Sequence, residues 1–234
     1  PESVDLQQII RTMVDGGIDY IPMEISSHAI KLHRVDDIDI NIAVFTNLSI
    51  EHLDFHGNME NYFKTKLELF KKLNKNSTAI INGDDKYSKD IINNISCNYL
   101  TYGFNNKFDL SVKSYVLDID WTKIIFKFKG QEFSIKTNLI GKFNIYNMMG
   151  AILTSWKLGL NITQIVNALS DFKTVPGRFE QFKLKNQNHA IVDYAHSPDA
   201  FKNILSSIKD LTTKNIITIF GCGGGRDKTK RSQM

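Results

Sequence analysis

Apolar residues in the first third of the chain follow two alternating patterns. One recurs every three or four residues, as on the buried face of a helix, and the other is a short continuous apolar run, as in a buried strand. The helical pattern covers residues 3–15, 25–35 and 59–73, and the strand pattern covers residues 18–23, 40–45 and 77–82. Alternation of this kind predicts a doubly wound α/β sheet.

The pattern changes in the second half of the chain. Between residues 108 and 138 apolar and polar positions alternate, which predicts a small antiparallel meander. The later elements are expected to be helices at 143–156 and 163–172, strands at 182–185 and 189–192, a helix after 197–199, and a strand at 216–220. Pro176 and Gly177 interrupt the pattern. We therefore place a domain boundary near Arg178, which gives domains of residues 1–178 and 179–234.

Composition restricts the class of protein. Of the 234 residues, 42% are hydrophobic and 23% are charged, as in ordinary globular proteins. The net charge of +4 comes from scattered residues; it is too small to indicate nucleic-acid binding and suits a polyanionic small substrate. Cys97 and Cys222 suggest neither a disulfide framework nor a zinc site. We expect a protein of the reducing cytoplasm.

The termini predict neither a leader nor an anchor. No apolar run approaches the roughly 18 to 20 residues that a membrane-spanning helix needs, and no basic segment followed by an apolar one opens the chain. The chain begins with Pro1 and ends at Met234, just after a predicted strand and a Gly-rich turn. We therefore expect the sequence to be a piece of a longer protein.

Two polar clusters follow predicted strands. In doubly wound sheets ligands bind beyond the carboxyl ends of the strands. Glu24 has that position, beside Ser26, which could equally be an ordinary helix cap. The second cluster, residues 46–57, contains Asn47, His52 and His56 beside carboxylates. Its side chains could bind metal or form a solvated loop.

Other polar residues also permit two readings. Lys66 on the helix at 59–73 could extend to water or be a buried, modified or phosphate-contacting group. Asn147 near the start of a helix could be a cap or could bind a base edge. Arg178 could be a hinge residue or bind phosphate, and Asp193 could bind a ribose or cap a helix. The Gly-rich turn at 221–227 offers backbone amides and Arg226 to an anion, which is a weak signal alone.

Taken in order, eight short segments carry a specific resemblance. They are EISSHA (24–29), HRV (33–35), FTNLS (45–49), HLDFHG (52–57), GKFNIYN (141–147), PGR (176–178), VDYAHSPDA (192–200) and FGCGG (220–224). Together they resemble the Mur ligase family, in particular its MurE type, the UDP-N-acetylmuramoyl-tripeptide synthetases. The resemblance implies a central ATPase-type sheet domain and the start of a Rossmann-like C-terminal domain.

The resemblance also implies a role for each candidate residue. Glu24, His52 and a carbamylated Lys66 would bind Mg²⁺; a lysine amine captures CO₂ only when it is uncharged, and burial favours that form. The remaining roles are UDP-muramoyl peptide binding by Ser26, Arg34 and Asn47, adenine binding by Asn147, γ-phosphate binding by Arg178, ribose or adenine contacts by Asp193 and His196, and binding of the incoming amino acid's carboxylate by Arg226.

The implied reaction spends ATP to make an amide bond. The D-Glu carboxylate of a UDP-muramoyl dipeptide becomes an acyl phosphate, which the amine of an amino acid attacks. The string around Arg226 favours meso-diaminopimelate over lysine as that amino acid. The partners would be these small molecules and ATP, with no nucleic acid or membrane, and the protein would be a monomer.

Departures from the family pattern limit these expectations. The Gly-rich phosphate loop and the UDP-binding domain would precede Pro1, so we expect this piece alone to be inactive. Leu32 and Gly225 replace polar and acidic residues, and Glu51 replaces the commoner Asp. The alternatives are a related amide ligase of the folylpolyglutamate or cyanophycin synthetase type, a non-catalytic remnant, and a metal hydrolase using His52 and His56.

Overall fold

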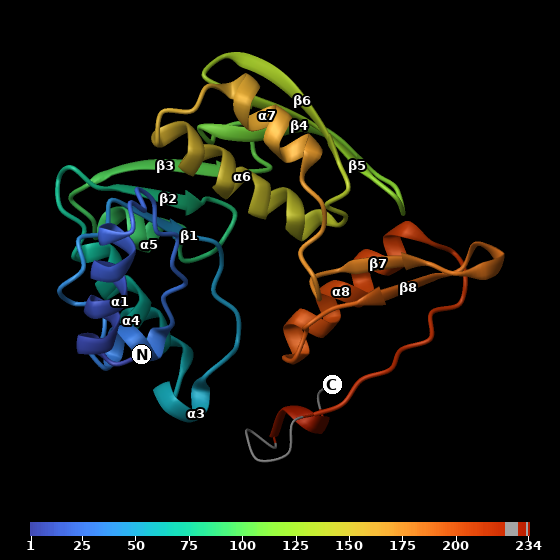
Figure 1. Ribbon diagram of the computed structural model, residues 1–234. Helices are drawn as coiled ribbons and strands as arrows, with labels where there is room; N and C mark the ends of the chain where they lie inside the picture. The colour runs from blue at the N-terminus through green and yellow to red at the C-terminus, as the bar shows by residue number, and fades with distance from the viewer. Residues whose placement is uncertain (223–228, 233) are drawn as a thin grey trace. The chain divides into compact units, whose positions relative to one another are not determined.

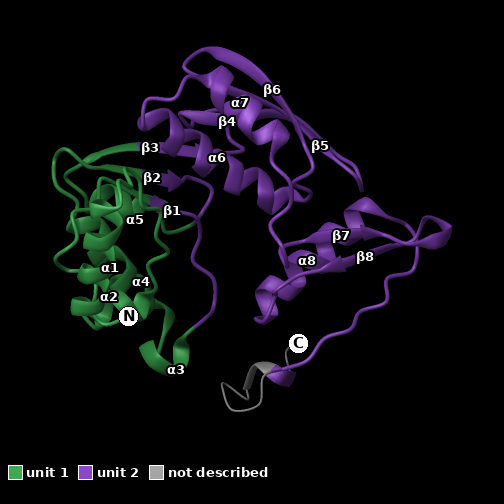
Figure 2. Cartoon of the chain, viewed as in Figure 1, with its two compact units in different colours: residues 1–43, 52–79, 86–99 green, residues 44–51, 80–85, 100–234 purple. Residues whose placement is uncertain are grey.

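The chain forms two compact units, shown in green and purple in Figure 2. The computed structural model describes residues 1–222, 229–232 and 234. Unit 1 comprises residues 1–43, 52–79 and 86–99, and unit 2 comprises residues 44–51, 80–85 and 100–234.

Unit 1 is mainly helical. Its helices are α1 (Ser3–Asp15), α2 (Ser27–Lys31), α3 (Leu53–His56), α4 (Met59–Lys71) and α5 (Ser88–Asn93). The polar residue before α4 explains where that helix begins, because Asn58 Oδ1 accepts a hydrogen bond from the Asn61 amide at 2.9 Å. The apolar face of α4 buries Tyr62, Phe63 and Leu67, so this helix supplies much of the unit's core.

A six-stranded sheet runs through the chain in sequence order (Figure 1). Its strands are β1 (Ile42–Phe45), β2 (Thr78–Asn82), β3 (Asn98–Gly103), β4 (Leu110–Leu117), β5 (Thr122–Phe128) and β6 (Gln131–Thr137). Strand β3 pairs with β4 in parallel, whereas β4 with β5 and β5 with β6 are antiparallel. In unit 2, Ile124, Phe126 and Ile135 have no exposed surface, which places the core on their face of the sheet.

Unit 2 also contains α6 (Lys142–Lys157), α7 (Ile162–Asp171) and a separate two-stranded sheet. Helix α6 buries Ile145, Met149 and Leu153, and α7 packs beside β6. The second sheet is an antiparallel pair, β7 (Glu180–Lys183) and β8 (His189–Val192), followed by α8 (Pro198–Leu211). Two 3-10 turns occur at Lys185–Gln187 and Thr229–Ser232. None of the described helices combines the length and apolarity that a membrane crossing requires.

The predicted α/β class and the antiparallel meander are confirmed. The strands predicted at 18–23 and 216–220 are wrong, since neither stretch is a strand here. An apolar run becomes a strand only where a neighbouring backbone pairs with it, and Ile18 and Ile217 are instead 49% and 89% exposed. The helix predicted at 25–35 is shortened to α2, and α3, α5 and β3 were not predicted.

Candidate functional site

Lys66 extends from α4 toward the segment that carries Glu24. Its Nζ donates a hydrogen bond to the carbonyl oxygen of Ile25 at 3.0 Å. Its neighbours Thr65 and Leu67 are buried, and Lys66 itself is half-buried. The lysine is therefore held against the chain one residue from Glu24, although α4 begins 35 positions later in the sequence (59 − 24).

His52 lies in unit 1 at the N-terminus of α3, in a left-handed backbone conformation with φ 58° and ψ 25°. Few residues other than glycine adopt this region, and those that do often serve a functional site. The His52 ring lies edge-on to His28, with centroids 4.9 Å apart, and 6.0 Å from the Tyr62 ring.

The neighbouring histidines are held in their neutral form. Burial lowers the pKa of both His28 and His56 below the ordinary value, and interaction with the other imidazoles of the group lowers both further. His56 Nε2 lies 2.8 Å from Ser27 Oγ in a buried hydrogen bond. Neutral imidazoles close together avoid mutual repulsion, so the cluster is stable near pH 7.

Two residues expected to bind substrate have protein partners in this structure. Ser26 Oγ accepts a hydrogen bond from the Ala29 amide at 3.1 Å, so Ser26 caps α2. Arg34 donates to both carboxylate oxygens of Glu2, at 2.7 Å and 3.1 Å. The capping interpretation of Ser26 thus holds here, and a substrate would have to compete with both interactions.

The donor set around Lys66 suits Mg²⁺ only after a chemical change. Mg²⁺ prefers oxygen ligands, which the exposed Glu24 carboxylate offers. In the described part of the chain no group of three or more His, Cys, Asp or Glu residues could hold a metal ion. An ammonium on Lys66 would repel the cation, whereas a carbamate would add two oxygens. The residues therefore fit magnesium if Lys66 is carbamylated.

Asn47 belongs to a loop of unit 2 that hydrogen bonds hold on both sides. Asn82 Nδ2 donates to the Thr46 carbonyl at 2.6 Å, and the Leu48 amide donates to Asp85 Oδ2 at 3.1 Å. The Asn47 side chain between them is exposed. The turn after β2 thus fixes the loop after β1 and leaves Asn47 accessible.

Asn147 is exposed on α6, and its Nδ2 donates to Asn144 Oδ1 at 3.2 Å. The preceding residue ties this helix to the turn after β2, because Tyr146 donates from its hydroxyl to Asp84 Oδ2 at 3.0 Å. The same oxygen accepts from the Phe104 amide at 2.6 Å. Burial, and then the bond to Asp84, raise the pKa of Tyr146.

The sequence analysis did not single out Asp84, Asp85 or Tyr146. A signal was present, because residues 83–85 read Gly-Asp-Asp directly after a predicted strand. Their partners, however, are 37 and 62 residues away. Such separations carry no local pattern.

Arg178, Asp193 and His196 lie near one another in unit 2. The Arg178 guanidinium lies 4.9 Å from the centroid of the Tyr194 ring. The two oxygens of Asp193 accept from the Phe179 and Ala195 amides, each at 2.7 Å.

His196 Nε2 lies 3.2 Å from Glu51 Oε1. The structure thus brings Arg178, Asp193 and His196 together, as the sequence analysis expected, but each already has a protein partner. Arg226, the residue expected to bind the incoming amino acid, lies outside the described residues.

Comparison with known proteins decides the family. A family model described as the Mur ligase middle domain matches residues 1–155, and one described as the Mur ligase glutamate ligase domain matches residues 177–234. The chain belongs to the Mur ligase family. The resemblance seen in the sequence is thereby confirmed.

Two curated relatives of this Mur ligase chain carry the same name. It is 40% identical over 237 residues to the UDP-N-acetylmuramoyl-L-alanyl-D-glutamate--2,6-diaminopimelate ligase of Clostridium botulinum. It is 42% identical over 234 residues to the enzyme of that name from Caldanaerobacter subterraneus. Both comparisons cover 100% of this chain and 48% of the relative, so the chain spans about half the length of these proteins.

Solved structures agree with the family assignment. A structure named as a UDP-N-acetylmuramoyl-L-alanyl-D-glutamate--2,6-diaminopimelate ligase superposes with a TM-score of 0.79 at 28% identity, covering 100% of this Mur ligase chain and 49% of the other. A folylpolyglutamate synthetase variant from L. casei, titled FPGS, reaches 0.62 at 18% identity, covering 78% of this chain and 46% of the other. The second likeness shows a shared fold alone.

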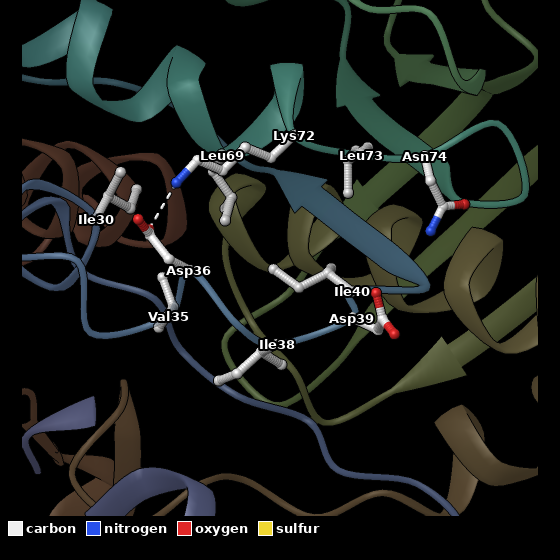
Figure 3. A pocket seen from close by; sticks show the side chains of 10 residues that line it. All are labelled: Ile30, Val35, Asp36, Ile38, Asp39, Ile40, Leu69, Lys72, Leu73 and Asn74. Carbon is white, nitrogen blue, oxygen red and sulfur yellow. Dashed lines mark hydrogen bonds and ion pairs between the residues drawn. The ribbon is translucent and has the colours of Figure 1, made fainter. Parts of the chain in front are cut away.

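A cavity of about 100 Å³ in unit 1 contains none of the predicted site residues (Figure 3). Aliphatic side chains line it, and Lys72 Nζ binds Asp36 Oδ1 at its edge, at 2.6 Å. The Asp36 carboxylate also lies 2.7 Å from His33 Nδ1. The lining is that of a packing defect closed by an ion pair, so the chemistry of this Mur ligase is to be sought elsewhere.

Proposed function

We propose that this chain is part of an ATP-dependent ligase that joins meso-diaminopimelate to UDP-N-acetylmuramoyl-L-alanyl-D-glutamate. The observation that carries the proposal is identity of 40% and 42%, over the whole chain, to two relatives named for that reaction. The carboxylate of D-Glu accepts the γ-phosphoryl group of ATP, and the amine then displaces phosphate to form the amide. The domain boundary at Arg178 is supported by family matches that end at 155 and begin at 177.

Glu24, His52 and Lys66 are proposed to bind Mg²⁺. The position of Lys66 Nζ, 3.0 Å from the Ile25 carbonyl, supports this role because it brings the amine beside Glu24. Its uncharged form attacks CO₂, a nitrogen–carbon bond forms, and the nitrogen loses a proton to leave an anionic carbamate. Bound Mg²⁺ would supply charge compensation for the phosphoryl oxygens.

The nucleotide is proposed to contact Asn147, Arg178, Asp193 and His196. Asn147 has an exposed amide that can pair with a base edge. Arg178 presents an exposed guanidinium, a group suited to phosphate, and it would offset charge that develops on the transferring phosphoryl group. Catalysis then depends on positioning and electrostatics, with Lys66 and Arg178 as the catalytic side chains.

The UDP-muramoyl dipeptide is proposed to contact Ser26, Arg34 and Asn47, and the amino acid's carboxylate to contact Arg226. Asn47 is exposed on a loop fixed at both sides, which favours a direct contact. Arg34 would exchange Glu2 for a substrate anion. This exchange is inexpensive, since exposed ion pairs contribute only about 0 to 1 kcal/mol.

The setting proposed for the enzyme is the cytoplasm, where it acts as a monomer on small molecules and contacts neither nucleic acid nor membrane. Cys97 and Cys222 are free cysteines, as expected in a reducing compartment. A net charge of +4 supports a small polyanionic substrate over a nucleic acid.

The test is an assay of the complete gene product. Phosphate release from ATP is measured with UDP-muramoyl dipeptide plus either diaminopimelate or lysine, and with each substrate omitted. Release that needs the dipeptide and diaminopimelate together supports the proposal. Release with lysine instead corrects the amino acid, and no release under any condition contradicts the ligase function and favours a non-catalytic remnant.

A further inference from the structure

His56 is the buried residue of a very short helix. It is 7% exposed, whereas the other residues of α3 are exposed or half-buried. A single helical turn does not hold its own shape in water, because fixing its backbone costs more than its few hydrogen bonds return. The position of α3, and of His52 at its N-terminus, therefore depends on the contacts of His56.

Two other helices hold His56. Its Nε2 lies 2.8 Å from Ser27 Oγ, at the start of α2. Its ring stacks on Tyr62 of α4, with centroids 5.0 Å apart and planes inclined by 18°. Its carbonyl accepts a hydrogen bond from Asn61 Nδ2 at 3.1 Å. These contacts fix both the ring and the backbone of His56.

Ser27 connects the same bond to the chain near Glu24. Ser27 is 1% exposed and begins α2, only three residues after Glu24. Lys66 Nζ holds the intervening Ile25 carbonyl at 3.0 Å. One buried hydrogen bond therefore joins the segment that carries Glu24 to the helix that follows His52, 28 residues further along (52 − 24).

We propose that His56 and Ser27 form a positioning pair that holds Glu24 and His52 in the arrangement that binds the divalent cation. This inference rests on the metal-binding role proposed above. Neither side chain binds the cation itself, because both are buried and face each other. Groups that orient metal ligands from behind typically contribute about 10- to 100-fold to metal affinity.

The decisive variants separate the hydrogen bond from the shape of the ring. His56→Phe keeps an aromatic ring against Tyr62 but removes the bond to Ser27. Ser27→Ala removes the same bond from the other side, and the double variant removes both partners. His56→Gln retains an amide that can hydrogen-bond the Ser27 hydroxyl.

The primary measurement is binding of Mn²⁺, as a probe for the cation, to the complete gene product without substrates. Electron paramagnetic resonance reports the free Mn²⁺. We expect His56→Phe and Ser27→Ala each to weaken binding about 10-fold. The double variant should be no weaker than either single variant, because residues that share one bond are non-additive. His56→Gln should stay within about 3-fold of the wild type, since a hydrogen-bonding partner for Ser27 remains.

Ser77→Ala is the matched control. Ser77 is another buried serine of unit 1, 2% exposed, and its hydroxyl donates to the Ile40 carbonyl at 2.8 Å. It should lower thermal stability about as much as Ser27→Ala but leave Mn²⁺ affinity unchanged. Equal Mn²⁺ affinity in the wild type and His56→Phe would overturn the inference, and so would equal weakening by Ser77→Ala.

Ligase activity is measured in parallel at increasing Mg²⁺. The half-saturating Mg²⁺ concentration should rise in His56→Phe, while the Michaelis constant for the amino acid stays unchanged. Without phosphate release from the wild type the proposed function fails, yet Mn²⁺ affinities still decide the positioning role. Conversely, an active wild type with no Mn²⁺ difference between variants retains the function and refutes the pair.

Discussion

Gly103→Ala should disturb the junction between the turn after β2 and helix α6. A Cβ at Gly103 would lie 2.6 Å from Asp84 Oδ2 and 2.6 Å from Phe108 Cε2, closer than carbon atoms are tolerated. Forcing an extra methyl group into packed space costs about 1 to 3 kcal/mol. The displaced Asp84 carboxylate would also weaken its bonds to the Phe104 amide and the Tyr146 hydroxyl.

The total effect is expected to be about 2 to 3 kcal/mol. Each bond to a charged group contributes about 1.5 to 3 kcal/mol when buried, but Asp84 is exposed, so only part of that is lost. In a protein of this size about 1 kcal/mol lowers the melting temperature by roughly 2 to 4 °C. A fall of roughly 4 to 12 °C is therefore expected, with a raised Michaelis constant for ATP because Asn147 adjoins Tyr146.

Thermal denaturation followed by circular dichroism is the assay. Phe108→Ala in the same chain should recover part of the loss, because it removes one of the two clashes and leaves that with Asp84. Gly16→Ala is the control, since its nearest contacts, at 3.4 Å, are ordinary. A Gly103→Ala protein that melts within about 1 °C of the wild type would refute the reasoning.

Two further changes test the proposed chemistry and the electrostatics of unit 1. Lys66→Ala should abolish phosphate release while the circular dichroism spectrum is retained, because no carbamate can form; turnover near that of the wild type would exclude the carbamate. Asp36→Asn tests an ion pair: hydrogen bonds from Lys72 and then His33 lower the pKa of Asp36. Since a lowered carboxyl pKa stabilises the fold above the unfolded value of 3.8 and the benefit disappears as pH falls, urea denaturation should show a deficit under about 1 kcal/mol at pH 7 and none near pH 2.

Local pattern was sufficient where an element buries one face of its own sequence. Helix α4 was predicted because Phe63, Leu67 and Phe70 recur at helical spacing, and these side chains are buried. The β5–β6 hairpin was predicted because Phe126 faces Phe133 across a Lys129–Gly130 turn, whose positive φ values suit a hairpin.

Elements that depend on distant partners could not be predicted. Strand β3 reads NYLTYG, which has no clear period, and it is a strand because β4 pairs with it from Leu110 onward. The same physics explains the opposite error at residues 18–23, where the apolar pattern is present but the pairing is not. In the site, the bond between Tyr146 and Asp84 spans 62 residues and left no local trace.

The proposed ligand contacts differ in what they require of the protein. Arg34 must release Glu2 before its guanidinium can bind a substrate anion, since its fork is occupied by both oxygens of one carboxylate. Asp193 need release nothing. Its oxygens each accept one backbone amide, and a carboxylate offers about four acceptor sites, so a ribose hydroxyl can be added while the Phe179 and Ala195 bonds persist. Substrate binding should therefore reorganise the Arg34 side chain and leave the Asp193 turn as it is.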